Sequence, residues 1–137
     1  MCYHITDKQK FHKKFVCKKH KTNYQKTSIE NTARVELHDK LNLTGAEISI
    51  NALPQGASVP FIHSHKQNEE IYIILNGKGK VIIDDESIEI KENDVIKISP
   101  KAKRQFFADT KSDLKYICIQ VKENSLENFT QSDAIIY

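Results

Sequence analysis

The sequence predicts an all-β fold in which antiparallel strands close into a barrel or pack as a sandwich. Two observations carry this prediction. At least eight short strand-like stretches, several with alternating apolar and polar residues, recur at roughly ten-residue spacing. Turn-forming residues separate them, and such a succession is typical of β-barrels and β-sandwiches. A chain of 137 residues is also long enough to build one domain with a real core.

The strands are predicted in order from the alternation and from the turns between them. The predicted strands are residues 34–39, 46–52, 59–65, 71–75, 80–83, 87–91, 95–98, 105–108 and 114–121. Asn76–Gly79 is expected to form a hairpin, because an Asn-Gly pair suits a type I′ turn. Residues 125–130 predict a short C-terminal helical turn with Ser125 as its N-cap, and with Leu126 and Phe129 docking on the end of the barrel.

Residues 1–32 are polar and rich in lysine, and we expect a basic arm there, ahead of a single barrel domain formed by residues 33–137. Residues 1–28 hold eight lysines and one acid, a net charge of +7, so the rest of the chain carries 3 − 7 = −4. A basic arm can bind nucleic acid, but this one lacks the arginine content of a nucleic-acid reader. We therefore favour a solvated tail, in which Phe11, Phe15 and Val16 offer a pattern for one strand.

The composition also indicates where in the cell the protein is expected to be found. No apolar run approaches the roughly 18 residues that a membrane span needs, and residues 1–31 contain no apolar stretch of the kind found in signal peptides. The three cysteines, Cys2, Cys17 and Cys118, are odd in number and show no C-x-x-C spacing. We expect a cytoplasmic protein without a disulfide framework, in which Cys118 packs as a small apolar side chain.

The chemistry is concentrated between residues 56 and 77. His63 and His65 are two residues apart, so in an extended segment their side chains lie on one face. Glu70 opens the next predicted strand, and an antiparallel return brings its carboxylate beside the imidazoles. Two imidazoles and one carboxylate form a facial triad that leaves coordination positions open for substrate or oxygen. The alternative is that the three side chains hydrogen-bond a small polar ligand directly.

This stretch resembles the first motif of the cupin family, Gly-x5-His-x-His-x3/4-Glu-x6-Gly. Gly56, His63, His65, Glu70 and Gly77 match it, except that six residues instead of five follow Gly56. The resemblance is specific over residues 56–79 and weaker to residue 121. It implies a double-stranded β-helix, a jelly-roll-like cupin barrel, holding a divalent transition metal such as Fe, Mn, Ni or Zn. It also implies a homodimer.

The second cupin motif, Gly-x5-Pro-x-Gly-x2-His-x3-Asn, has a divergent counterpart in residues 93–109. Asn93 and Ala102 stand in place of glycines and Asp109 in place of the asparagine. By this alignment Gln105 occupies the position of the family's third histidine ligand. Its carbonyl oxygen is a weaker ligand than imidazole. The resemblance therefore implies His63, His65 and Glu70 as ligands, with Gln105 as a doubtful fourth.

Alternation also predicts the walls of a pocket. If Gln105 faces inward, Phe107 does too, while Arg104 and Phe106 face the other way. A one-residue shift of register would instead bring Arg104 to the pocket, where it could bind an anionic group. We expect four walls around the polar groups, formed by Phe61, Tyr72, Ile74 and Phe107.

Two classes of function remain from the sequence. The first, slightly favoured, is a metal-dependent enzyme acting on a small molecule by dioxygenase, isomerase or lyase chemistry. The second is a non-catalytic module that binds a sugar or metabolite without a required metal. The homodimer implied by the resemblance has independent support, because apolar residues are expected on faces opposite the pocket and need to be covered. These are Ile62, Ile71, Ile73 and Ile117.

Overall fold

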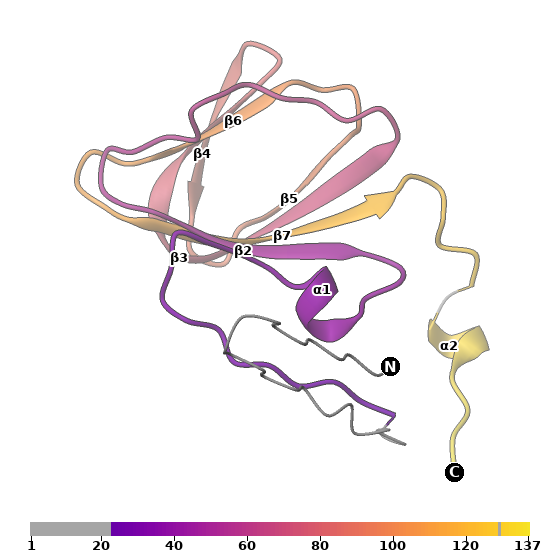
Figure 1. The fold of residues 1–137 in the computed structure, drawn as a ribbon. Coiled ribbons are helices and arrows are strands. Elements are labelled where there is room, and N and C mark those ends of the chain that lie inside the picture. The colour runs from indigo at the N-terminus through magenta and orange to yellow at the C-terminus, as the bar shows by residue number, and fades with distance from the viewer. Residues whose placement is uncertain (1–22, 129) are drawn as a thin grey trace, which may run out of the picture.

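The computed structural model describes residues 23–128 and 130–137. Seven strands and two short helices occupy this part of the chain: β1 (Arg34–Glu36), α1 (His38–Leu41), β2 (Glu47–Leu53), β3 (Asn68–Ile83), β4 (Glu86–Lys91), β5 (Val95–Ile98), β6 (Arg104–Ala108), β7 (Leu114–Lys122) and α2 (Thr130–Asp133). All pairings between the strands are antiparallel. The predicted all-β, jelly-roll-like fold is therefore confirmed (Figure 1). No helix among the described residues is long and apolar enough to cross a membrane.

The long strand β3 joins the two sides of the barrel. Its first half pairs with β5 and β7, and its second half pairs with β4 and β6. Strand β7 also pairs with β2, and β2 pairs with β1, which lies at the edge of the sheet. Because one strand serves both sheets, Tyr72 near its start and Val81 near its end pack into the same core.

The predicted hairpin at Asn76–Gly79 is wrong, because β3 runs straight through it. The register against β7 shifts between Ile74 and Asn76 instead. Gly77 has φ +79°, and a Cβ there would lie 1.7 Å from the carbonyl oxygen of Asp113. The glycine therefore permits a bulge and a close approach of two strands. The chain turns later, at Asp84 and Asp85, whose φ values of 47° and 66° suit a type I′ turn.

Three further boundaries differ from the sequence prediction. Residues 58–65 form an irregular segment with isolated bridges at Ser58 and His63 and a bend at residues 60 and 61, not a regular strand. The strand predicted over residues 34–39 stops at Glu36, because the backbone N–H groups of the next two residues bond the Glu47 carboxylate and α1 follows. The C-terminal helix begins at Thr130 instead of Ser125.

The contacts expected of the C-terminal turn and of the arm are only partly testable. Leu126 is 80% exposed, so it does not dock on the barrel. Phe129 lies outside the described residues, as do Cys2, Cys17 and the strand expected near Phe11.

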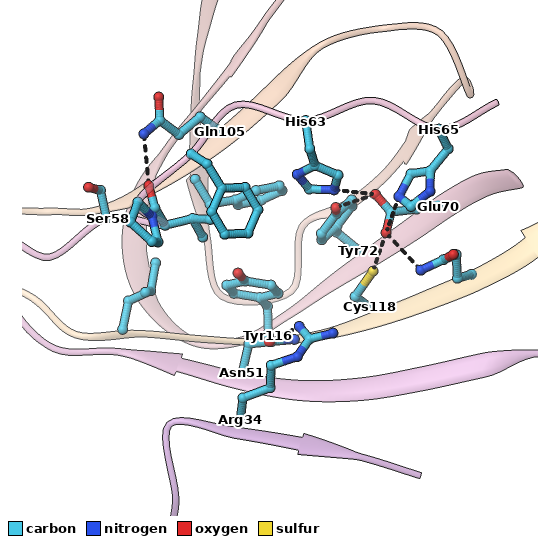
Figure 2. A pocket seen from close by; sticks show the side chains of 16 residues that line it. Arg34, Asn51, Ser58, His63, His65, Glu70, Tyr72, Gln105, Tyr116 and Cys118 are labelled. Carbon is cyan, nitrogen blue, oxygen red and sulfur yellow. Dashed lines mark hydrogen bonds and ion pairs between the residues drawn. The ribbon is translucent and has the colours of Figure 1, made fainter. Parts of the chain in front are cut away.

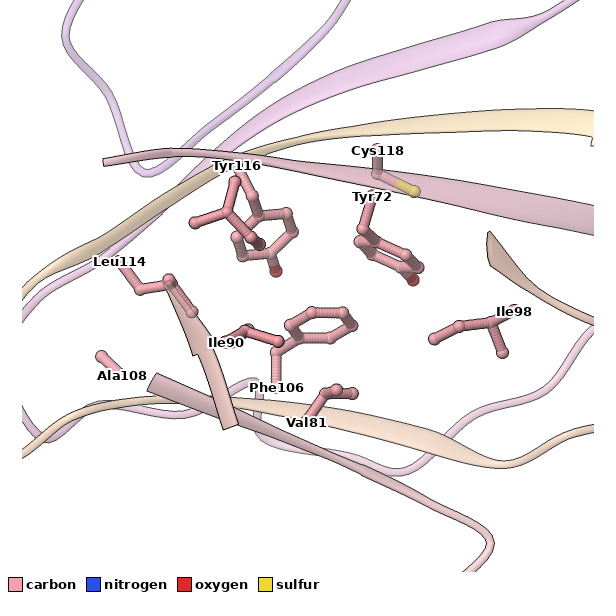
Figure 3. Close-up of a cluster of buried hydrophobic side chains, with 10 residues drawn as sticks. Tyr72, Val81, Ile90, Ile98, Phe106, Ala108, Leu114, Tyr116 and Cys118 are labelled. Atoms are coloured by element: carbon pink, nitrogen blue, oxygen red, sulfur yellow. The ribbon is translucent and has the colours of Figure 1, made fainter. Parts of the chain in front are cut away.

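The core lies between the two sides of the barrel (Figure 3). Three rings form its centre: Tyr72 and Phe106 have centroids 4.3 Å apart, and Phe106 and Tyr116 are stacked at 5.0 Å. Such aromatic pairs contribute beyond the area they bury. Aliphatic side chains complete the core, namely Ile74, Val81, Ile90, Ile98, Ala108 and Leu114. This packing fixes the inward faces of β3, β6 and β7, on which the polar site is built.

Candidate functional site

The structure brings His63, His65 and Glu70 together at one end of the barrel interior (Figure 2). The histidines come from the irregular segment before β3, and Glu70 is the third residue of β3. His63 Nε2 lies 3.5 Å from Glu70 Oε1, and His65 Nε2 lies 3.2 Å from Glu70 Oε2. All three ligand atoms lie within 4.8 Å of one another.

Backbone hydrogen bonds hold the histidine segment in place although it is not a strand. His63 exchanges two backbone bonds with Arg104 of β6, at 3.2 and 2.9 Å. The His65 N–H donates to the carbonyl of Pro100 at 2.7 Å. The backbone of this segment is therefore fixed against the first residue of β6 and against the loop that follows β5.

The Glu70 carboxylate is buried and well supplied with donors. The Tyr72 hydroxyl donates to Oε1 at 2.6 Å, and the Cys118 thiol donates to Oε2 at 3.2 Å. The Gln120 amide is a longer donor to Oε2, at 3.5 Å. Burial by itself would raise the pKa of Glu70, but the bonds from Tyr72 and Cys118 and the nearby positive charges outweigh it and lower this pKa. The carboxylate is therefore anionic and fixed in orientation.

The imidazole of His63 is in the protonation state that suits a metal. Burial is the main reason that the pKa of His63 is lowered from 6.5, so the ring is neutral at pH 7. His63 Nδ1 and His65 Nε2 are buried without a hydrogen-bond partner among the described residues. Ligands at about 2.0–2.2 Å from a common ion lie roughly 3 Å from each other, close to the 3.2 and 3.5 Å measured here. The donor set therefore fits a divalent ion.

A cationic side chain lies beside this group. Arg104 is fully buried, and its Nε is 3.5 Å from Glu70 Oε1. Its Nη2 donates to the Ser99 carbonyl at 3.0 Å, while Nε and Nη1 have no hydrogen-bond partner among the described residues. Since Arg104 carries +1 and Glu70 carries −1, the two charges cancel, and the protein offers a divalent ion no net negative charge at this point.

The alternation predicted for β6 is wrong by one residue. Arg104, Phe106 and Ala108 are the buried positions, while Gln105 and Phe107 are half-buried, although Gln105 still lines the cavity. The Gln105 amide donates to the Val59 carbonyl at 2.7 Å, and its side chain lies across the cavity from His65 (Figure 2). Gln105 is therefore no part of the His–His–Glu group.

Of the four residues predicted to form the walls of the pocket, two line the cavity and two do not. Phe61 and Tyr72 line the cavity beside the His–His–Glu group, as does Phe106. Ile74 is 1% exposed and belongs to the core. Phe107 lies under the Lys80 ammonium, 5.2 Å from its ring centroid, and does not line the cavity. Phe106 replaces it because the core selects the other face of β6.

The cavity has a volume of about 440 Å³, enough for a small molecule. Its lining includes polar side chains that the sequence analysis missed, namely Arg34, Asn51, Cys118 and Gln120. The period-two pattern of β7 could have placed Cys118 and Gln120 beside Tyr116. Arg34 gave no such signal, because it reaches the cavity from the edge strand β1.

A second group of possible ligands lies near the surface, formed by Glu36, His38 and Glu47. His38 contacts the Glu47 carboxylate through Nδ1 and lies 3.0 Å from Asp39 through Nε2. The sequence analysis gave His38 no role, because only the β1–β2 pairing brings these residues together. The group is partly exposed. Its side chains are engaged in ion pairs and hydrogen bonds with one another and with neighbouring residues.

Comparison with known proteins gives consistent matches. Residues 50–120 match the family described as the cupin domain. A cupin protein of Bacteroides fragilis has a similar structure, with TM-score 0.82, 57% identity, and 85% of this chain and 98% of that chain covered. The uncharacterized protein MJ1618 of Methanocaldococcus jannaschii is 30% identical over 113 residues, which are 79% of this chain and 90% of that protein.

A more distant structural match is a predicted oxalate decarboxylase of Thermotoga maritima. It has TM-score 0.50 and 28% identity, with 55% of this chain and 64% of that chain covered. The fold and the family are thus seen in several proteins.

Proposed function

This chain belongs to the cupin family, and on that premise we propose that it holds one divalent transition metal through His63, His65 and Glu70. We further propose that it acts on a small molecule in the adjoining cavity. The observation that carries the proposal is the convergence of three ligand atoms within 4.8 Å at the cavity wall. Two neutral imidazoles and one carboxylate are a ligand set used by Fe, Mn, Ni and Zn sites.

A bound divalent ion would supply Lewis acidity or a centre for oxygen chemistry, as dioxygenase, isomerase or lyase reactions require. The protein's own part is to orient the ligands. Tyr72 and Cys118 hold the two oxygens of Glu70, and the backbone bonds of His63 and His65 fix the rings. The supporting groups stay protonated at neutral pH and so do not act as bases there, because burial raises the pKa of the Cys118 thiol to about 12 and also raises that of the Tyr72 hydroxyl. This supports metal-centred chemistry over catalysis by two strong general bases.

A second candidate is a non-catalytic cupin that binds a small molecule without a metal. The observation that favours it is Arg104, because its charge cancels that of Glu70 and lowers the attraction for a cation. In this case the two imidazoles would hydrogen-bond the ligand directly.

We also propose that the protein is a homodimer. Six isoleucines lie on the outer face of the β2–β7–β3 sheet, in two rows set by the strand register: Ile48, Ile119 and Ile71, then Ile50, Ile117 and Ile73. All six are half-buried. An outer sheet face is normally polar, so a face of this composition supports burial against a second copy.

The test of the metal proposal is metal content by plasma mass spectrometry on tag-free protein, before and after loading. We expect close to one metal per chain, lost in the double variant His63→Ala/His65→Ala. His38→Ala is the matched control, since it removes the ligand of the second group and leaves the first intact. If loading fails, or if only His38→Ala lowers the metal content, the metal proposal is wrong. Ligand screening on metal-free protein then tests the second candidate.

A further inference from the structure

Arg34 brings a positive charge to the wall of the same cavity. It lies on β1, paired with Asn51 of β2, and paired residues of an antiparallel ladder point to the same face. Its side chain therefore reaches past Asn51 toward Tyr116 and lines the cavity (Figure 2). The charge enters from the edge of the sheet, whereas the His–His–Glu group lies near the start of β3.

Two buried polar residues hold this guanidinium. Arg34 Nη1 donates to Asn51 Oδ1 at 2.7 Å, and Asn51 Nδ2 donates to the Ser49 hydroxyl at 3.0 Å. Asn51 and Ser49 are 6% and 3% exposed on the inward face of β2. Burying an amide and a hydroxyl is costly unless they are hydrogen-bonded. The Ser49 and Asn51 side chains bond each other, and Asn51 also bonds Arg34. The inward face of β2 therefore holds the guanidinium in position.

Arg34 keeps unused donors. Of the five N–H bonds of a guanidinium, Nε and one on Nη2 go to Glu36 Oε1 at 3.2 and 3.1 Å, and one on Nη1 goes to Asn51. One N–H on each terminal nitrogen is left without a partner among the described residues. The Tyr116 hydroxyl, on the same wall, also has none there, and burial raises its pKa so that it stays a neutral donor.

We propose that Arg34 is the anion-binding residue of this cavity and that the ligand is a small carboxylic acid with an apolar or aromatic body. Two free N–H bonds and a neutral hydroxyl match one carboxylate. No lysine lines the cavity in the part of the chain that the structure describes, so a doubly charged phosphate would lack a second cation. The remaining walls are largely apolar, formed by Leu53, Val59, Phe61 and Phe106.

The charge around the His–His–Glu group also favours an anionic ligand. Because Arg104 cancels Glu70, a divalent ion held there would keep both of its positive charges, which favours an anionic ligand. This argument rests on the proposed function, whereas the Arg34 argument stands without a metal. The identity of the ligand can therefore be tested on both metal-free and metal-loaded protein.

The experiment is a ligand-observed NMR titration with phenylacetate and 3-phenylpropionate, beside their neutral amides and phenyl phosphate. We expect both carboxylates to bind more tightly than their amides and than phenyl phosphate. Arg34→Gln should weaken carboxylate binding about tenfold or more, because it removes a charge-assisted hydrogen bond. Arg34→Lys should restore only part of this loss, since an ammonium cannot bind a carboxylate bidentately.

Two control variants separate a local contact from a general loss of charge. Lys115→Gln removes a positive charge from the exposed face of β7 and should leave binding unchanged. Glu36→Gln removes the carboxylate that competes for Arg34 and should leave binding unchanged or tighten it. Thermal unfolding of each variant checks that it is folded.

The outcomes are distinct from those of the metal test. Equal binding of carboxylates and amides, a preference for phenyl phosphate, no carboxylate binding, or wild-type binding by Arg34→Gln would each overturn the carboxylate proposal. Metal content measured on the same samples reports the proposed function separately. A protein that loads metal and does not bind carboxylates refutes only the ligand class, and one that binds carboxylates but cannot be loaded with metal refutes only the metal proposal.

Discussion

Arg104 Nε lies 3.5 Å from Glu70 Oε1, and the two residues are 0% and 3% exposed. This buried pair places a fixed positive charge directly behind the carboxylate of the candidate metal site. Together with the hydrogen bonds from Tyr72 and Cys118, the Arg104 charge keeps the buried glutamate anionic, and it sets the charge that any bound ligand meets. The effect of a metal on this pair is open to direct measurement.

We predict that Arg104→Met destabilises the metal-free protein by about 3–5 kcal/mol, because it leaves an uncompensated buried carboxylate. The same variant should bind a divalent metal more tightly than the wild type, since the opposing charge is gone. Urea unfolding with and without metal measures both effects, and Arg104→Lys is the control that keeps the charge. Weaker metal binding by Arg104→Met would contradict the electrostatic account.

The hydroxyl of Tyr72 can be removed without changing its ring. Tyr72→Phe should lower the free energy of unfolding by about 1.5–3 kcal/mol, because a hydrogen bond to a buried charged group is lost. Tyr116→Phe is the matched control, since the Tyr116 hydroxyl has no partner among the described residues. We expect its effect to be small. Equal effects of the two substitutions in urea unfolding would show that the bond to Glu70 contributes nothing.

Stability should depend on pH through Glu70. Its pKa in the folded protein is below the ordinary 4.5, so its ionised form stabilises the fold at any pH above 4.5. That contribution is lost as the pH falls below 4.5 through the folded pKa. The difference in unfolding free energy between wild type and Glu70→Gln, both metal-free, should stay constant from pH 7 to 5.5 and shrink below 4.5. Glu89→Gln, at an exposed position of β4, should show no such change. A difference that grows on acidification would reverse the sign of the shift.

The bulge in β3 predicts a strong glycine requirement at one position. Gly77→Ala combines a positive φ with a Cβ only 1.7 Å from the Asp113 carbonyl oxygen, so we expect a loss of more than about 2 kcal/mol or a failure to fold. Gly45→Ala should be nearly neutral, because nothing lies within 4 Å of the added carbon. Thermal unfolding of the two variants compares them directly, and similar melting temperatures would refute the close approach at Gly77.

The isoleucine rows on the outer sheet face predict the oligomeric state. Light scattering should give twice the chain mass of 15.8 kDa. Ile73→Lys, at the β3 end of one row, should give the monomer, because it buries a charge at the interface. Lys97→Gln on the neighbouring strand β5 is the control and should remain dimeric. A wild-type mass of one chain at all concentrations would exclude the dimer.

The sequence determined the fold class and the group of candidate metal ligands. Alternation and turns located β2, β4, β5 and β7 to within one or two residues, because a strand with one buried face repeats with period two. His63, His65 and Glu70 are close in sequence, so an extended segment and an antiparallel return are enough to bring them together. These features depend on local geometry, which a single chain can reveal.

Tertiary structure decided what surrounds that group. Both faces of β6 carry a polar residue and a phenylalanine, so alternation could not tell whether Arg104 or Gln105 faces inward; packing of Phe106 between Tyr72 and Tyr116 chose Arg104. Arg34 reaches the cavity only through the pairing of β1 with β2. The charge balance of the site thus comes from residues that are distant in sequence, because contacts between strands, and not spacing along the chain, set which side chains meet.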